Sequence, residues 1–351
     1  MKKVKIINGI QQVGIGVKDA KQVFNWYRKN LGFDILVFED VATASLMTRY
    51  TDGVAHERYA ILALNMVGGG GLEIWEYRSR VSEPSKTSLL LGDLGINVLK
   101  IRSHSIDKVY AKLQEQGINH LSKNGKSHFF FSDSWGNLVQ VVKDDYCFTA
   151  TKSCSGGVSG SIIGVSDMRK ALRFYQGFLG YETLISDQTG VFADFERLPG
   201  GGNQFRRVLL KHPARQIGGF GELYGPSQIE LLQVLDRTPH KIYKDRLWGD
   251  LGYIHLCFDV NGMNVLRQEA KSLGYEFTVD SADSFDMGEA AGRFAYVEDP
   301  DGTLIEFVET HKVPIHKKLG LYINLKNRNP FKPLPKILVK ALKFHRRTKD
   351  L

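Results

Sequence analysis

Apolar and polar positions along the chain follow two periods that replace each other several times. Apolar residues recur at helical spacing over 20–31, after the candidate N-cap Asp19 and before Gly32, so a helix is predicted there. Short segments such as GGLEIWEY at 70–77 and GTLIEFVE at 302–309 predict strands. The alternation of helices with several strands indicates an α+β fold.

The predicted helix recurs in the second half of the chain. VKDAKQVFNWYRKNLGF (17–33) aligns without gaps with VSDMRKALRFYQGFLGY (165–181), at an offset of 148 residues. GDLGINVLKI from Gly92 aligns with GDLGYIHLCF from Gly249, at an offset of 157. The chain is therefore a tandem duplication.

Each half holds a weaker internal repeat of a strand, a helix that ends in glycine, and further strands. Two of the repeat units end in a turn, DSWGN or DPDGT, in which glycine supplies a positive φ. Repeats of this size pack against each other to bury a shared core. The four repeat units run roughly over 8–80, 91–146, 157–236 and 248–311.

Composition is that of an ordinary globular protein, with 42% hydrophobic and 24% charged residues. The three cysteines show no metal-binding spacing and suit a reducing compartment. We identify no signal peptide and no run of 18 apolar residues, so a cytoplasmic location is expected.

Three motifs together resemble the vicinal oxygen chelate superfamily: VSDMRKALRFYQGFLGY, GYIHLCFDV and DPDGTLIEFVE. This group includes glyoxalase I, methylmalonyl-CoA epimerase, extradiol dioxygenases and bleomycin-resistance proteins. The resemblance covers about residues 8–311. It implies four βαβββ modules that form two paired open β-barrels, each around a cavity. A metal ion then lies between the first and last strands of two paired modules.

In the C-terminal half, the resemblance implies a metal site made by Glu230, His255 and Glu306, whereas Gly160 holds the fourth place. One imidazole and two carboxylates suit one divalent ion, namely Zn, Fe, Mn, Co or Ni. The alternative is that His255 is a structural core residue and that the glutamates are solvated. The resemblance makes Glu230 or Glu306 the candidate general base.

Three further residues are candidates for substrate binding: Arg207, Tyr296 and Asp259. Arg207 follows a glycine-rich loop that either covers the cavity or is a plain surface hairpin. Tyr296 packs in the core by default, and Asp259 shares a strand face with His255 by the two-residue period.

The corresponding places in the N-terminal half are Gln12, Glu73, Val98 and Gln140, a weaker ligand set. Lys100 lies on the same strand face as Val98 and either lines an anion pocket or is solvated or salt-bridged. This half is expected to be a scaffold or a metal-free binding cavity.

The resemblance implies a divalent-metal enzyme that acts on a small oxygenated substrate through a stabilised enolate or oxyanion. Isomerase, epimerase or lyase chemistry fits best. An extradiol dioxygenase is the second alternative, although its iron site uses two histidines. A binding or resistance protein without catalysis is the third. The chain is expected to be a monomer or a homodimer.

The positive charge is concentrated at the C-terminus. Residues 311–351 carry nine Lys and three Arg against one Asp, a net charge of +11 within a total of +9. The segment 333–350 predicts an amphipathic helix that either docks on the protein itself or contacts an anionic membrane surface or an acidic partner. No nucleic-acid motif occurs, so nucleic-acid binding is not expected. The predicted division is 1–150, 151–311 and 312–351.

Overall fold

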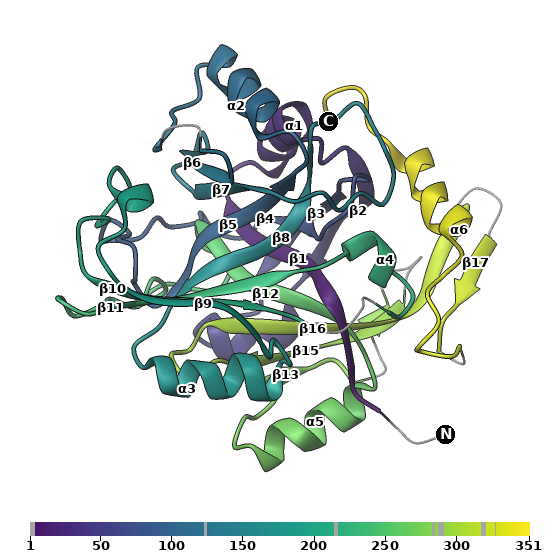
Figure 1. Cartoon of the computed structure of the whole chain (residues 1–351). Coiled ribbons are helices and arrows are strands. Elements are labelled where there is room, and N and C mark those ends of the chain that lie inside the picture. The colour runs from purple at the N-terminus through teal and green to yellow at the C-terminus, as the bar shows by residue number, and fades with distance from the viewer. Residues whose placement is uncertain are drawn as a thin grey trace.

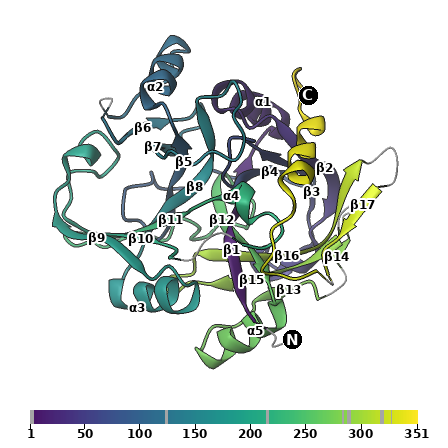
Figure 2. The same cartoon turned by 45° about the vertical axis from the view of Figure 1, so that its right-hand side comes forward.

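The computed structural model of the protein describes residues 4–122, 125–213, 217–282, 285–286, 291–316, 321–326 and 328–351. It confirms the α+β class: two mixed β-sheets form the centre, and the helices lie outside them (Figure 1). Helices α1 and α2 lie together at one end of the molecule, and α3 and α5 lie at the other (Figures 1 and 2).

Among the described residues, the first sheet has ten strands and the second has seven. The first sheet runs in the order β13 (Val279–Asp280), β15 (Ala291–Glu298), β16 (Leu304–His316), β12 (Gly252–Asn261), β1 (Ile6–Val17), β4 (Gly71–Tyr77), β3 (Glu57–Leu64) and β2 (Ile35–Thr43). In addition, β14 (Phe285–Asp286) pairs with β15, and β17 (Leu321–Asn324) pairs with β16. The second sheet runs in the order β6 (His128–Ser132), β7 (Leu138–Lys143), β5 (Gly95–Ser103), β8 (Ser155–Gly164), β11 (Gln228–Val234), β10 (Phe205–Lys211) and β9 (Thr183–Gly190).

The α-helices are α1 (Ala20–Leu31), α2 (Ile106–Glu115), α3 (Met168–Leu172), α4 (Gly221–Tyr224), α5 (Met263–Ser272) and α6 (Lys336–Lys340). Helix α3 continues as a π-helical segment over Arg173–Phe178, and 3-10 segments cover Ser45–Tyr50, Ala193–Phe195 and Ala341–His345. The predicted helix start and stop in the first repeat are confirmed. Asp19 accepts a hydrogen bond from the Gln22 amide, and Gly32 ends α1 in the left-handed conformation.

The sheets do not follow the two halves of the chain. The first sheet joins the first module to the fourth through the antiparallel pair β1 and β12. The second sheet joins the second module to the third through the antiparallel pair β5 and β8. Each half of the duplication therefore contributes one module to each sheet, and a site between paired modules must draw on both halves.

Within each half, the two modules are tied together by a buried tyrosine. The Tyr27 hydroxyl on α1 donates to Asp133 in the turn before β7, at 2.9 Å. The Tyr175 hydroxyl donates to Asp299 in the turn before β16, also at 2.9 Å. These turns are the DSWGN and DPDGT motifs, so the aspartates cap the turn and also hold the helix of the neighbouring module.

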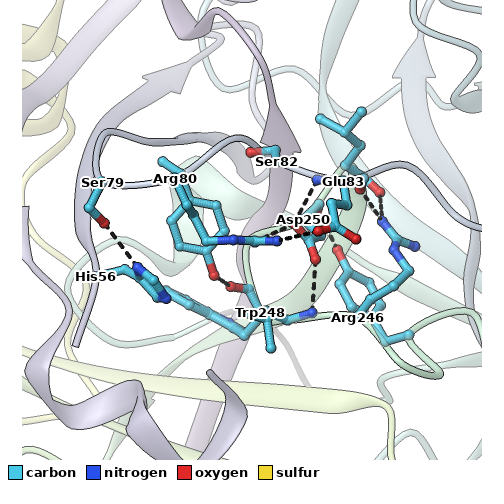
Figure 3. Close-up of polar contacts among 12 residues, drawn as sticks. His56, Ser79, Arg80, Ser82, Glu83, Arg246, Trp248 and Asp250 are labelled. Carbon is cyan, nitrogen blue, oxygen red and sulfur yellow. Dashed lines mark hydrogen bonds and ion pairs between the residues drawn. The ribbon is translucent and has the colours of Figure 1, made fainter. Parts of the chain in front are cut away.

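Two connections lead from one sheet to the other, 78–94 between β4 and β5 and 235–251 between β11 and β12. They bind each other through the aspartates of the repeated GDLG motif, and we call these two sets of contacts the clamps. Asp250 is fully buried, receives the Arg80 guanidinium at 2.6 Å, and accepts from the Glu83 and Leu247 amides (Figure 3). Asp93 in turn receives Arg237 at 2.6 Å and accepts from the His240 and Leu90 amides. Every partner of one aspartate's carboxylate has its counterpart 157 residues away at the other carboxylate, so the two motifs make the same contacts.

The C-terminal segment docks on the first module. Leu334 and Val339 are buried in an apolar cluster with Ile35 of β2, and Arg346 lies 3.2 Å from Asp34. The predicted helix is shorter than expected, since α6 gives way to a 3-10 segment at Ala341. Among the helices that the structure describes, none has the length and hydropathy to cross a membrane.

Prediction for the clamps. We expect Asp250→Asn and Asp93→Asn each to lower the free energy of unfolding by about 2–4 kcal/mol, because each leaves a guanidinium without its carboxylate. Arg80 and Arg237 keep 17% exposure, which moderates the loss. Urea unfolding measures it, with the exposed helix residue Glu115→Gln as a control. Losses no larger than the control's would show that the clamps do not stabilise the fold.

Candidate metal centre

Strand β12 carries His255 in the middle of the first sheet. Its residues alternate between two faces: Leu256 and Phe258 pack into the main apolar core, while His255, Cys257 and Asp259 face the other side. His255 is fully buried. The strand therefore fixes the imidazole on the face that is turned away from the helices.

Neighbouring strands bring two carboxylates to the His255 ring. On one side, β1 places Gly14 opposite His255 and also opposite Glu73 of β4. On the other side, β16 places Glu306 opposite Cys257. His255 Nε2 lies 3.3 Å from Glu73 Oε2 and 3.1 Å from Glu306 Oε2. Their candidate ligand atoms all lie within 4.8 Å of one another.

Gly14 makes this convergence sterically possible. A Cβ added at Gly14 would lie 2.4 Å from Cε1 of the His255 ring, far inside van der Waals contact. Glycine is required at this position to let the imidazole lie across β1 towards Glu73.

The donor set fits a divalent ion. His255 Nε2 and Glu306 Oε2 are buried, and neither makes a hydrogen bond of good geometry with any residue that the structure describes. Buried polar atoms are normally satisfied, so these two atoms indicate a missing partner. The other ring nitrogen, Nδ1, faces the Tyr296 hydroxyl at 3.4 Å, a contact that can fix the orientation of a ligating imidazole. Gln12 adds an amide next to the set, since its Nε2 donates to Glu73 Oε2 at 3.1 Å.

The carboxylates make the site favourable for positive charge. Burial alone would lower the pKa of His255, but Glu306 and Glu73 outweigh it and raise that pKa to about 10. Burial, together with the same two carboxylates, raises the pKa of the Tyr296 hydroxyl well above its usual value. The arrangement therefore stabilises a cation between the carboxylates and keeps Tyr296 protonated.

Aromatic rings surround the candidate ligands. The Trp248 ring lies parallel to His255 with centroids 6.5 Å apart, and Tyr296 meets the imidazole edge-on at 5.6 Å. Trp75 packs against Trp248 at 4.6 Å. Trp248 belongs to the clamped connection, and its carbonyl accepts from the Tyr77 hydroxyl (Figure 3). Its indole N–H is buried and has no acceptor among the described residues.

Glu230 and Arg207 do not lie in this site, which corrects their predicted placement beside His255. Glu230 lies on β11 in the second sheet, fully buried between Lys100 and Arg207. Arg207 also contacts Asp194 at 2.9 Å. The physical reason is module pairing: the third module shares its sheet with the second module and not with the fourth.

The second sheet has the counterpart of the metal centre, filled by a lysine. In strand register, Val98 of β5 pairs with Leu138 of β7, as His255 of β12 pairs with Leu304 of β16. Lys100 pairs with Gln140, as Cys257 pairs with Glu306. Lys100 is buried and donates to Glu230. Burial alone would raise the pKa of Glu230, yet Lys100 and Arg207 lower it below its usual value. The Lys100 ammonium group thus supplies the positive charge that the Glu230 carboxylate would otherwise need from a metal ion.

The remaining candidates fall into two groups. Tyr296 contacts His255, as described above, so it adjoins the site. Asp259 lies farther along β12, where Asn8 Nδ2 donates to it at 2.8 Å, and burial raises its pKa to about 7. Glu73 and Gln12 were predicted as ligand places of the N-terminal half, and not as partners of His255. The substrate-binding roles of Tyr296 and Asp259 and the catalytic role of Glu306 stay predictions.

Prediction for the glycine. We expect Gly14→Ala to displace the His255 ring and lower the affinity for a divalent ion at least about tenfold, the usual scale for perturbing a ligand's support. Isothermal titration with Zn²⁺ and Mn²⁺ measures the affinity. Gly177→Ala, where an added Cβ meets nothing within 4 Å, is the control. Unchanged affinity in a folded Gly14→Ala variant would contradict the geometry.

Prediction for the buried lysine site. Glu230→Gln leaves the charge of Lys100 and part of that of Arg207 unpaired, so we expect a loss of about 3–5 kcal/mol in unfolding free energy at pH 7. The folded-state pKa of Glu230 is depressed, so its contribution is present above about pH 4.5 and is lost as the pH falls through the folded value. Urea unfolding at several pH values should show the wild-type advantage shrinking in acid. A difference independent of pH would contradict the ion pair.

Comparison with known proteins agrees with this architecture. The model of the Glyoxalase/Bleomycin resistance protein/Dioxygenase superfamily matches residues 9–141 and 158–307, one range in each half of the duplication. A proposed dioxygenase from Bacillus subtilis has a similar fold, with a TM-score of 0.57 and 14% identity over 87% of this chain and 86% of that one. Glyoxalase I from Zea mays is similar at a TM-score of 0.55 and 13% identity over 87% of this chain and 92% of that one. None of the curated proteins matches the chain. The structural likenesses show the fold alone, but the family model covers most of both halves, and the chain therefore belongs to the Glyoxalase/Bleomycin resistance protein/Dioxygenase superfamily.

Proposed function

We propose that the protein is a divalent-metal-dependent enzyme that acts on a small oxygenated substrate by isomerase, epimerase or lyase chemistry. The observation that carries this proposal is the convergence of Glu73, His255 and Glu306 from three strands of one sheet. A divalent ion bound there supplies Lewis-acid stabilisation of negative charge on neighbouring substrate oxygens.

The chain's own groups have separate tasks in this proposal. His255 is held in place by β1 and by the Tyr296 hydroxyl. Glu306 or Glu73 accepts a proton from the substrate carbon and returns it, the role that the sequence analysis gave to Glu230 or Glu306. The buried indole N–H of Trp248, which lacks an acceptor among the described residues, is a donor for a substrate oxygen.

The surrounding rings favour this chemistry. Trp75, Trp248 and Tyr296 are almost completely buried and exclude water from the face that carries His255. In such surroundings, charge interactions are stronger than in water, and a reactive carbanion-like species is protected from side reactions. The substrate class that fits is small, with two adjacent oxygens and an apolar remainder.

The dioxygenase alternative is weaker on the donor set. The iron site of extradiol enzymes uses two histidines and one carboxylate, whereas this site offers a single imidazole with two carboxylates. The place of the second histidine is held by Gln12. A metal-free binding protein is the other alternative, and metal content separates it from an enzyme.

Prediction for the metal. We expect about one equivalent of a transition metal in protein purified without a metal-binding tag. Glu73→Gln, His255→Ala and Glu306→Gln should lose it, because each removes one of three ligands. Glu230→Gln is the matched control, since it changes a buried glutamate at the corresponding place of the other sheet and should keep the ion. Elemental analysis with thermal unfolding in parallel makes the measurement.

The wild type and the same variants also test the reaction class. The wild type is incubated in D₂O with a panel of 2-oxoaldehyde–thiol adducts and 2-methyl acyl thioesters. We expect metal-dependent exchange of a substrate hydrogen for deuterium, or turnover, and its loss in Glu306→Gln. A wild type that holds no metal after incubation with each ion would refute the enzyme proposal and favour ligand binding. If Glu230→Gln were the variant that lost the metal while the other three kept it, the metal site would instead include Glu230, as predicted from the sequence for the C-terminal half.

A further inference from the structure

The C-terminal helical segment presents apolar side chains outward as well as inward. Val339 and Leu342 lie in the apolar cluster that docks the segment on the first module. Ile337 and Phe344, in contrast, are 77% and 74% exposed. An amphipathic helix docked by its apolar face would have buried Ile337 with the other apolar residues of 333–350, and the structure instead exposes it. Single exposed apolar residues are ordinary, but two at this spacing form a defined strip.

The spacing puts these two residues on one side of the segment. Seven residues make about two helical turns, so Ile337 and Phe344 project in nearly the same direction. Val339 lies about half a turn away, facing the protein. The segment runs along the outside of the molecule beside β2 and β17 (Figures 1 and 2).

A row of basic residues flanks the apolar strip. Helical spacing places Lys336, Lys340 and Lys343 along one edge of it, and the exposed Arg347 follows just after the helical segment ends at His345. Lys336 lies 3.7 Å from Glu222. Over the described part of the chain, no carboxylate lies within ion-pair distance of Lys340, Lys343 or Arg347. Most of the row is therefore available to an external anion.

The surface is also held firmly in place. The Arg347 amide donates to the Asp34 carbonyl at 2.7 Å, and Lys29 lies 2.7 Å from Asp350 near the C-terminus. Arg28 pairs with the same aspartate. The acidic residue of the segment is thus turned to the body, so it does not neutralise the outer face. Binding a partner would cost little ordering of the segment.

We propose that residues 336–347 form a docking surface for an anionic lipid bilayer. Ile337 and Phe344 enter the boundary between headgroups and acyl chains, and Lys340, Lys343 and Arg347 contact lipid phosphates. Charge complementarity, together with the exposed apolar strip beside the basic row, favours a lipid surface over an acidic protein or a nucleic acid. The proposal is independent of the metal centre.

Vesicle co-sedimentation of the full chain tests the proposal, with phosphatidylcholine alone and with phosphatidylcholine mixed with phosphatidylglycerol. We expect binding to the mixed vesicles only, and weaker binding at high salt. Lys340→Gln/Lys343→Gln should lower the partition coefficient about twenty-fivefold, at about fivefold per basic residue. Ile337→Ser/Phe344→Ser should lower it at least about tenfold.

Matched controls change equivalent residues elsewhere. Leu184→Ser/Val191→Ser removes two exposed apolar residues at the far sheet, and Lys108→Gln/Lys170→Gln removes two exposed lysines on other helices. Both controls should bind as the wild type does. Phe344→Trp should in addition be quenched by brominated anionic lipid, which reports insertion directly. Absence of binding to mixed vesicles, equal binding to neutral ones, or binding untouched by both tail variants would overturn the proposal.

Discussion

The antiparallel pairing of β1 with β12 is the contact on which the rest of the molecule depends. It joins the first module to the last, and it sets Gly14 against His255 so that the imidazole can reach across β1 to Glu73. The three candidate ligands therefore come from positions far apart in the chain, and none of the modules could assemble the set alone. Because strand register alternates faces, a slip of one residue would turn His255 towards the helices and replace it with an apolar side chain.

The two sheets solve the same electrostatic problem in different ways. Each brings a glutamate to the face that is turned away from the helices, the partly buried Glu73 or the buried Glu230, and a carboxylate withdrawn from water needs a positive partner. In the second sheet, Lys100 supplies that partner from within the protein, with Arg207 beside it. In the first sheet, the place of Lys100 is taken by Cys257, which carries no charge, and a second carboxylate is added by Glu306. The charge balance there calls for a cation from solution, and this difference explains why, among the described residues, the candidate metal centre lies in the first sheet.

The sequence predicted the parts of the site better than their assembly. The helix pattern around Asp19 and Gly32 and the α+β class follow from local periodicity, and the duplication follows from aligned segments of the sequence; the structure reproduces the helix and the α+β class. The family resemblance marked His255 and Glu306 as ligand places, and the repeat offset extended these places to Gln12 and Glu73. It could not assign their partners, since an offset of 157 residues aligns the halves equally well whichever modules share a sheet. Pairing each half with itself gave Glu230 to His255, an error that follows from the missing tertiary information. The role of Trp248 was beyond reach for the same reason, because its position depends on a connection between the sheets.

The connections between the sheets show how a duplicated sequence can specify sheets that each combine one module from each half. The chain leaves one sheet and enters the other twice, and both crossings carry the GDLG motif. If each half had folded on itself, Asp93 and Asp250 would each face solvent or a partner in their own repeat. Instead, Asp250 holds Arg80 of the first crossing and Asp93 holds Arg237 of the second, a reciprocal pair that exists only when the crossings lie side by side. The clamp that fixes module pairing also fixes Trp248 over His255. The candidate centre and the pairing of the modules thus depend on the same two buried aspartates.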